Sequence, residues 1–277
     1  MAQTNRLKLL FVFDHEYPHL WKDGLWAALK ILEKDWDIEY LNLNDDIIGK
    51  VILRDAPVQL EKYDFVLGWG GFNSPVDKML ENVTTNKGLC IGGNAFPYHS
   101  GYDVLFHETD FVKVFLGLQG NCVKAFGVNT DIYYNDYLND EKKRVFDVIS
   151  VGAFASWKRH FLLRGKKGLR LAIGQIQRNN PEESLGIING LLYDGVMVSD
   201  MVEPEKLAEL YRSSDLCYIP ADIMGGGERA ILEARACGIN VECEEDNLKL
   251  KELCTGPIPH EHDYAEALKK GILSVCV

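Results

Sequence analysis

Short apolar runs alternate with amphipathic stretches along most of the chain. Residues 7–13 (Leu-Lys-Leu-Leu-Phe-Val-Phe) are almost continuously apolar, whereas residues 25–34 carry their apolar side chains on one helical face. An apolar run rich in strand-forming residues is typical of a strand that is buried on both faces of a parallel sheet. Apolar positions three and four residues apart are typical of a helix that packs on such a sheet. The pattern therefore predicts strand–loop–helix units.

These strand–loop–helix units are repeated in both halves of the chain, and a polar stretch separates the halves. Residues 135–144 (Asn-Asp-Tyr-Leu-Asn-Asp-Glu-Lys-Lys-Arg) are the predicted linker. We therefore expect two doubly wound α/β domains, 1–137 and 138–277. Further strands are expected at 37–43, 64–73 (ending in a glycine-rich turn), 88–92, 102–107, 123–128, 146–151, 169–174, 193–198, 215–219 and 240–243. Further helices are expected within 44–63 and at 75–82, 110–116, 204–213, 246–253 and 262–275.

Composition and charge limit the classes of function. The chain of 277 residues is 47% hydrophobic and 26% charged, which suits two globular domains with ordinary cores. A net charge of −11 without a long basic run disfavours non-specific binding to nucleic acid or anionic lipid. The seven cysteines are scattered, without a Cys-x-x-Cys pair, and are expected to be buried free thiols. The sequence shows neither a signal peptide nor an apolar run long enough for a membrane span, so a cytoplasmic location is expected.

One stretch combines a glycine run with a helical pattern. Residues 224–241 read Met-Gly-Gly-Gly-Glu-Arg-Ala-Ile-Leu-Glu-Ala-Arg-Ala-Cys-Gly-Ile-Asn-Val. Glycines in front of a helix allow backbone N–H groups to converge on one point, and the helix N-terminus adds about half a positive charge there. The stretch therefore predicts a site for a phosphate group.

Several motifs of the second half follow one another in a fixed order. Residues 151–160 (Val-Gly-Ala-Phe-Ala-Ser-Trp-Lys-Arg-His) come first, residues 202–220 form a helix-then-strand pattern ending in Asp-Leu-Cys-Tyr-Ile-Pro, and Leu-Glu-Ala-Arg-Ala-Cys-Gly follows within 224–241. In this order they resemble the donor domain of GT-B glycosyltransferases of the GT4-like family. The resemblance covers residues 146–255 well and the first half of the chain in outline.

The resemblance implies a fold and an activity. The implied fold is GT-B, in which two Rossmann-like doubly wound domains face each other across a cleft. The implied reaction transfers a sugar from a nucleotide-diphosphate sugar, such as a UDP-sugar, with retention of configuration and without a metal or a further cofactor. The Asp-x-Asp tripeptide Asp35-Trp36-Asp37 lies outside the motifs that carry the resemblance, and no metal requirement is expected. The acceptor stays open between a glycan, a small molecule and a modified DNA base, and the net charge disfavours DNA.

The resemblance and the strand-end positions together select the candidate site residues. Glu233 is expected to accept hydrogen bonds from the ribose hydroxyls of the donor. The catalytic candidates are Glu228, near the helix start, and His15, in the loop after the first strand, which would be the base if the transfer inverts the configuration instead. Glu228 as a purely electrostatic helix stabiliser and Arg229 as a partner of Glu233 are open alternatives. The candidate diphosphate-binding residues are Gly24, Lys158, Arg159, Gly226, Gly227 and Arg229.

Three departures from the family pattern keep other functions open. Gly225 stands where the family has the first of two glutamates, Ala153 replaces an arginine, and Arg159 replaces a glycine. The chain is also short for a GT-B enzyme. The alternatives are a non-catalytic protein that binds a nucleotide or a sugar, and a sugar-nucleotide epimerase.

Overall fold

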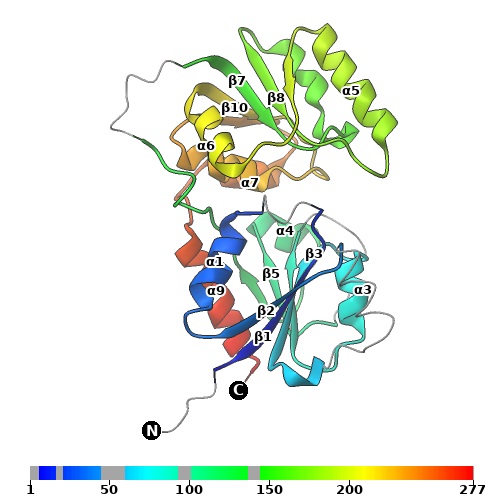
Figure 1. The fold of residues 1–277 in the computed structure, drawn as a ribbon, viewed down its shortest axis with the longest axis vertical. Coiled ribbons are helices and arrows are strands. Elements are labelled where there is room, and N and C mark those ends of the chain that lie inside the picture. Colours follow the sequence, from blue (N-terminus) through cyan, green and yellow to red (C-terminus); the bar gives the residue numbers. More distant parts are fainter. Residues whose placement is uncertain (1–5, 17–20, 45–59, 93–100, 137–143, 277) are drawn as a thin grey trace. The chain divides into compact units, whose positions relative to one another are not determined.

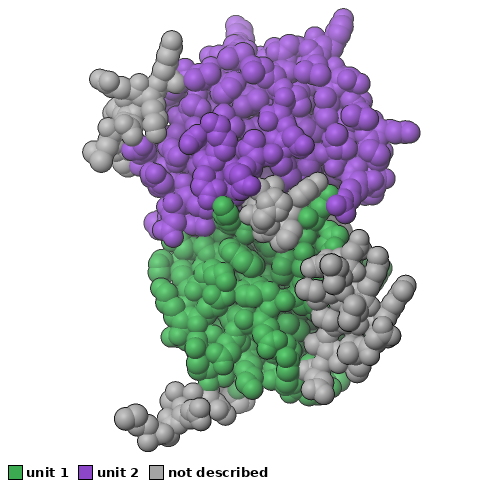
Figure 2. All heavy atoms as spheres, in the orientation of Figure 1, with its two compact units in different colours: residues 1–127, 261–277 green, residues 128–260 purple. Residues whose placement is uncertain are grey.

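The computed structural model describes residues 6–16, 21–44, 60–92, 101–136 and 144–276. The chain forms two compact units, one of residues 1–127 with 261–277 and one of residues 128–260 (Figure 2). Most of the predicted linker and most of the helix expected within 44–63 lie outside the described residues. In the described part of the chain, no helix is long and apolar enough to cross a membrane.

The first unit is built on a parallel sheet of six strands in the order β2-β1-β3-β4-β5-β6 (Figure 1). The order changes direction between β1 and β3, which makes that position the topological switch point of this sheet. The strands are β1 (Lys8–Phe13), β2 (Asp37–Asn42), β3 (Phe65–Gly70), β4 (Lys87–Ile91), β5 (Val104–His107) and β6 (Cys122–Lys124).

Helices cover both faces of this sheet, which explains why β1 is apolar on both sides. Leu10 and Val12 of β1 belong to the core cluster that α3 (Pro75–Glu81) and α4 (Asp110–Phe115) help to form. Figure 1 shows α1 (Gly24–Leu32) and α9 (Glu261–Leu273) side by side on the opposite side of the sheet from α3. The doubly wound arrangement predicted from the sequence is confirmed for this unit.

The C-terminal helix packs with the first unit, although the sequence analysis placed residues 261–277 in the second domain. The apolar face of α9 is the reason, because Tyr264, Leu268 and Ile272 are buried. At Gly271 a side chain would meet the ring of Phe106 in β5, since a Cβ there would lie 2.5 Å from Cε1. The unit boundaries at 127/128 and 260/261 therefore differ from the expected boundary at 137/138.

The second unit contains a parallel sheet of five strands in the order β11-β10-β7-β8-β9. Its topological switch point lies between β7 and β10, the two central strands that pair directly. The strands are β7 (Phe146–Val151), β8 (Arg170–Ile173), β9 (Met197–Ser199), β10 (Ser214–Ile219) and β11 (Asn240–Cys243). The helices are α5 (Pro181–Tyr193), α6 (Pro204–Arg212), α7 (Glu228–Ala236) and α8 (Leu248–Cys254).

Helix α5 is a long element that the hydrophobic pattern did not predict. Leu185, Leu192 and Tyr193 are exposed, whereas Ser184 and Leu191 are buried, so the helix lacks a clear apolar stripe. The strand expected at 193–198 is shorter and begins later, as β9. All seven cysteines are free thiols, as expected, but only Cys90, Cys217 and Cys237 are buried and the other four are half-buried.

Candidate functional site

The candidate site of the second unit lies where β7 and β10 end. These strands are parallel neighbours at the switch point, so the segments that follow them emerge at the same edge of the sheet. After β7 the chain forms a short 3-10 turn, Ser156–Lys158. After β10 it forms a loop over residues 220–227, here called the glycine loop, which leads into α7.

Lys158 joins these two segments. Its Nζ donates a hydrogen bond of 2.6 Å to the carbonyl oxygen of Gly226. The pKa of Lys158 is lowered to about 8, mainly by burial. Repulsion from Lys249 and Arg229 lowers this pKa further, whereas attraction by Glu228 acts to raise it. Lys158 is therefore a desolvated cation in a strongly charged environment.

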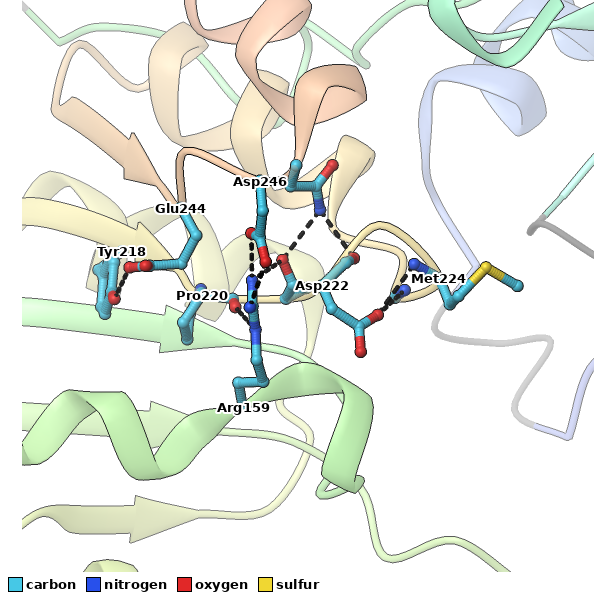
Figure 3. A network of polar contacts seen from close by, with 10 residues as sticks. Arg159, Tyr218, Pro220, Asp222, Met224, Glu244 and Asp246 are labelled. Atoms are coloured by element: carbon cyan, nitrogen blue, oxygen red, sulfur yellow. Dashed lines mark hydrogen bonds and ion pairs between the residues drawn. The ribbon is translucent and has the colours of Figure 1, made fainter. Parts of the chain in front are cut away.

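The glycine loop needs its glycines for steric reasons. Gly227 has a φ of 149°, which side chains rarely tolerate, and a Cβ there would lie 2.6 Å from Cγ2 of Ile219. At Gly225 a Cβ would lie 2.8 Å from the carbonyl oxygen of Trp157. Asp222 holds the start of this turn, because its Oδ1 accepts the N–H groups of Met224 and Gly225, each at 2.9 Å (Figure 3).

Glu228, the first residue of α7, is engaged on both carboxylate oxygens. Its Oε2 accepts the N–H group of Gly227 at 2.6 Å, and its Oε1 lies 2.7 Å from Nζ of Lys249. Burial acts to raise the pKa of Glu228, but Lys249 and the backbone N–H group of Glu228 itself hold it below its usual value. The carboxylate is thus ionised, and it is bound to the loop and to α8.

Arg159 makes contacts that the sequence did not suggest. Its Nε donates to the carbonyl oxygen of Pro220 at 2.7 Å and its Nη2 to that of Ala221 at 3.0 Å. Nη1 and Nη2 form a bidentate pair with Asp246 at 2.7 and 2.8 Å (Figure 3). The guanidinium group therefore ties the turn after β7 to the glycine loop and to the segment before α8. These contacts are with the protein itself, whereas the sequence analysis expected a phosphate.

Helix α7 carries the other two candidates of this unit. Glu233 is buried, with 8% of its surface exposed, and its Oε2 accepts a hydrogen bond of 3.4 Å from the hydroxyl group of Tyr211. Arg229 is exposed and close enough to Lys158 to lower its pKa. Gly226, Gly227, Glu228 and Lys158 form one contiguous cluster, here called the lysine–glycine cluster.

Gly24 and His15 belong to the first unit. Gly24 is the buried first residue of α1, whose N-cap Asp23 accepts the N–H group of Trp26 at 3.0 Å. His15 follows β1 and stacks on Trp21 at a centroid distance of 5.2 Å. His15 follows the carboxyl end of β1, as the strand pattern predicted, and Gly24 opens the first long helix, as expected.

Three residues around the lysine–glycine cluster were not predicted from the sequence. Asn247 donates to the carbonyl oxygens of Ala221 and Asp222 at 2.9 and 2.8 Å, and Asp246 binds Arg159. Lys249 is fully buried. A signal for Lys249 existed, since it lies four residues before the buried Leu253 and so shares its helical face. Among the described residues, no group of three or more His, Cys, Asp or Glu side chains is arranged to hold a metal ion.

Comparison with solved structures identifies the fold. Sucrose-phosphate synthase from Thermosynechococcus elongatus matches with a TM-score of 0.63 at 13% identity over 98% of this chain and 90% of that chain. Anabaena HepE in complex with UDP-glucose matches with a TM-score of 0.63 at 12% identity over 97% of this chain and 90% of that chain. The chain has the GT-B fold.

The GT-B fold of this chain is also similar to that of a second class of enzyme. A UDP-N-acetylglucosamine 2-epimerase structure from Listeria monocytogenes matches with a TM-score of 0.52 at 13% identity, over 98% of this chain and 91% of that chain. No protein-family model and no curated protein sequence matches the chain. At these identities the likeness establishes the fold, and the activity has to be inferred from the residues of the site.

Proposed function

We propose that the chain is a glycosyltransferase whose donor is a nucleoside-diphosphate sugar. The observation that carries the proposal is the Lys158 ammonium group, held at the switch point of the sheet against Gly226 and beside the start of α7. Ligands of open α/β sheets bind at this position, and a helix N-terminus favours an anion. The fold is shared with HepE, a structure of which contains UDP-glucose.

The charges around Lys158 favour an anionic ligand. Lys249 and Arg229 repel the ammonium group, and burial deprives it of water, so both effects destabilise its charged form. A diphosphate next to Nζ would replace the neutral carbonyl oxygen of Gly226 by a charged acceptor and would relieve this penalty. The diphosphate is therefore the part of the donor that Lys158 is proposed to bind.

The same cation would assist the transfer step. Negative charge develops on the departing diphosphate when the bond to the sugar breaks, and a fixed positive charge stabilises that transition state. We propose that Lys158 supplies this charge without a metal ion, and that Glu233 on α7 accepts hydrogen bonds from the ribose hydroxyls. Retention of configuration is proposed from the motif resemblance, and the acceptor is a glycan, a small molecule or a modified DNA base.

The roles of two expected residues change in this proposal. Because Glu228 binds Gly227 and Lys249, we assign it to shaping the glycine loop. Because Arg159 binds Pro220, Ala221 and Asp246, we assign it to holding the same loop. Lys158 is then the proposed diphosphate-binding side chain of the turn after β7.

A panel of donors tests the proposal. The full chain is incubated with UDP-, GDP- and ADP-sugars, with and without acceptor mixtures, and the released nucleoside diphosphate is quantified. The expected result is release from at least one donor by the natural chain and loss of release in Lys158→Met. Conversion of the donor into its epimer would favour an epimerase, for which the Listeria structure is the supporting observation. Binding without any turnover would favour a non-catalytic protein.

A further inference from the structure

A single peptide unit of the glycine loop is held at both ends. The carbonyl oxygen of Gly226 accepts the hydrogen bond from Nζ of Lys158, and the N–H group of Gly227 donates to Oε2 of Glu228, both at 2.6 Å. These two groups belong to the same peptide bond. Its plane is therefore fixed between a cation on one side and a carboxylate on the other.

The carboxylate of Glu228 is held in turn by Lys249. Their charged atoms lie 2.7 Å apart, and the exposed fractions of the side chains are 1% for Lys249 and 9% for Glu228. An unpaired buried carboxylate would take up a proton or unfold its surroundings, because desolvation of a single charge is costly. Lys249 thus keeps Glu228 ionised, so that both of its oxygens are acceptors.

The position of Lys249 is set by the same loop. Lys249 is the second residue of α8, and Asn247 caps this helix by accepting the N–H group of Leu250 at 3.2 Å. The side-chain amide of Asn247 also donates to the carbonyl oxygens of Ala221 and Asp222 in the loop. Helix α8 is therefore anchored to the loop that its lysine helps to shape.

We propose that Lys249 is a positioning residue of the donor site, which acts through Glu228 to fix the Gly226–Gly227 peptide and thereby the place of the Lys158 ammonium group. This inference rests on the proposed function. Lys249 touches Glu228 and does not bind the donor itself. With the peptide fixed, Lys158 is held near the carbonyl oxygen that a phosphate would displace, so little rearrangement is needed when the donor binds.

Two adjacent glycines make this restraint necessary. Gly226 and Gly227 lack side chains that would limit rotation, and Gly227 already adopts a φ of 149°. Without the Glu228–Lys249 pair, the peptide between them would be free to rotate about both flanking bonds. The carbonyl oxygen of Gly226 would then no longer define the position of Lys158.

A charge-neutral double variant tests the proposal without leaving a buried charge unpaired. Lys249→Met/Glu228→Met replaces both ions by neutral side chains of similar size that cannot accept the N–H group of Gly227, whereas Lys249→Met alone leaves Glu228 unpaired and is expected to destabilise the fold. The matched control is Lys251→Met, the same change in α8 at a partly exposed lysine whose partner, Glu245, lies at the surface. Melting temperature confirms that each variant is folded, and calorimetric titration gives its UDP affinity.

The expected result is a loss of affinity that depends on Lys158. The double variant should bind UDP about tenfold more weakly, the scale expected for one charge-assisted hydrogen bond, while Lys251→Met should match the natural chain. In a Lys158→Met background the double change should have no further effect, because Lys249 acts through Lys158. Additive effects in this cycle, or unchanged affinity in the double variant, would overturn the proposal while leaving the proposed function intact.

A second measurement needs no ligand. The pKa of Lys158 in the free protein is followed by NMR of its side chain in the natural chain and in the double variant. The value should fall in the double variant, because the attraction by Glu228 outweighs the repulsion by Lys249. If UDP, GDP and ADP all fail to bind while this shift occurs, the proposed donor class is wrong, whereas the coupling of the Glu228–Lys249 pair to the Lys158 ammonium group stands. An unchanged pKa would overturn the positioning role of Lys249.

Discussion

The ammonium group of Lys158 donates a hydrogen bond of 2.6 Å to the carbonyl oxygen of Gly226, across the switch point of the second sheet. The two residues are 68 positions apart in the sequence, and they meet because β7 and β10 are neighbours. A neutral carbonyl oxygen is a weaker partner for a desolvated cation than a phosphate oxygen. Under the proposed function, this contact marks the place where the diphosphate of the donor is expected to bind.

Replacement of Lys158 should weaken nucleotide binding without unfolding the protein. Lys158→Met is expected to lower the affinity for UDP by roughly 1.5–3 kcal/mol, because a charge-assisted hydrogen bond is lost. Isothermal titration calorimetry gives the affinity, and Lys167→Met, at an exposed lysine of the same connection, is the control. Equal affinity in both variants would remove Lys158 from the site.

The affinity for UDP should depend on pH through Lys158. Its pKa is about 8 in the free protein, and a bound diphosphate would raise it. Below pH 8 the ammonium form is already present and the affinity should be constant. Above pH 8 binding must take up a proton, so the affinity should fall, by up to about tenfold per pH unit. Titrations between pH 7 and 10 measure this slope, and a slope that persists in Lys158→Met would assign it to another group.

The conformation of Gly227 should make alanine costly at this position. Gly227→Ala is expected to destabilise the fold by about 1–3 kcal/mol, because of the positive φ and the contact with Ile219. Gly186→Ala is the control, since Gly186 lies in α5 with open space around it. Alanine there should stabilise the helix by about 0.5–1 kcal/mol. Urea unfolding compares the two, and similar stability of both variants would contradict the loop conformation.

Arg159 should affect the stability of the glycine loop more than the binding of phosphate. Arg159→Lys loses the bidentate contact with Asp246 and the donors to Pro220 and Ala221, at a cost of about 1–2 kcal/mol. The melting temperature should fall, and the UDP affinity of the folded variant should stay within about threefold, well below the loss that one charge-assisted bond gives. An unchanged melting temperature with a loss of affinity equal to that of Lys158→Met would restore the role predicted from the sequence.

Local patterns were sufficient for much of the fold. The apolar run that became β1 and the glycine run in front of α7 each carry their own signal, and both elements are where the sequence placed them. Helix α5 carried no such signal because several of its apolar residues are exposed. The packing of α9 on the first unit depends on surfaces more than a hundred residues earlier in the chain, among them Phe106.

Some site residues could also be predicted from local motifs, whereas the contacts of others depend on residues that are distant in the sequence. Lys158 and Gly226 were predicted from motifs, because their residue types and order suffice to suggest a phosphate site. The partners of Arg159 lie 61, 62 and 87 positions away, so only the folded chain shows that the guanidinium group is occupied by the protein. Lys249 pairs with Glu228 through the packing of α8 on α7, which no local pattern reveals.

The most direct measurement is a crystal structure of the full chain with a nucleoside diphosphate bound. We expect a phosphate oxygen within hydrogen-bond distance of Nζ of Lys158, in place of the carbonyl oxygen of Gly226, and Glu228 still paired with Lys249. A nucleotide bound elsewhere, with Lys158 still donating to Gly226, would contradict this expectation.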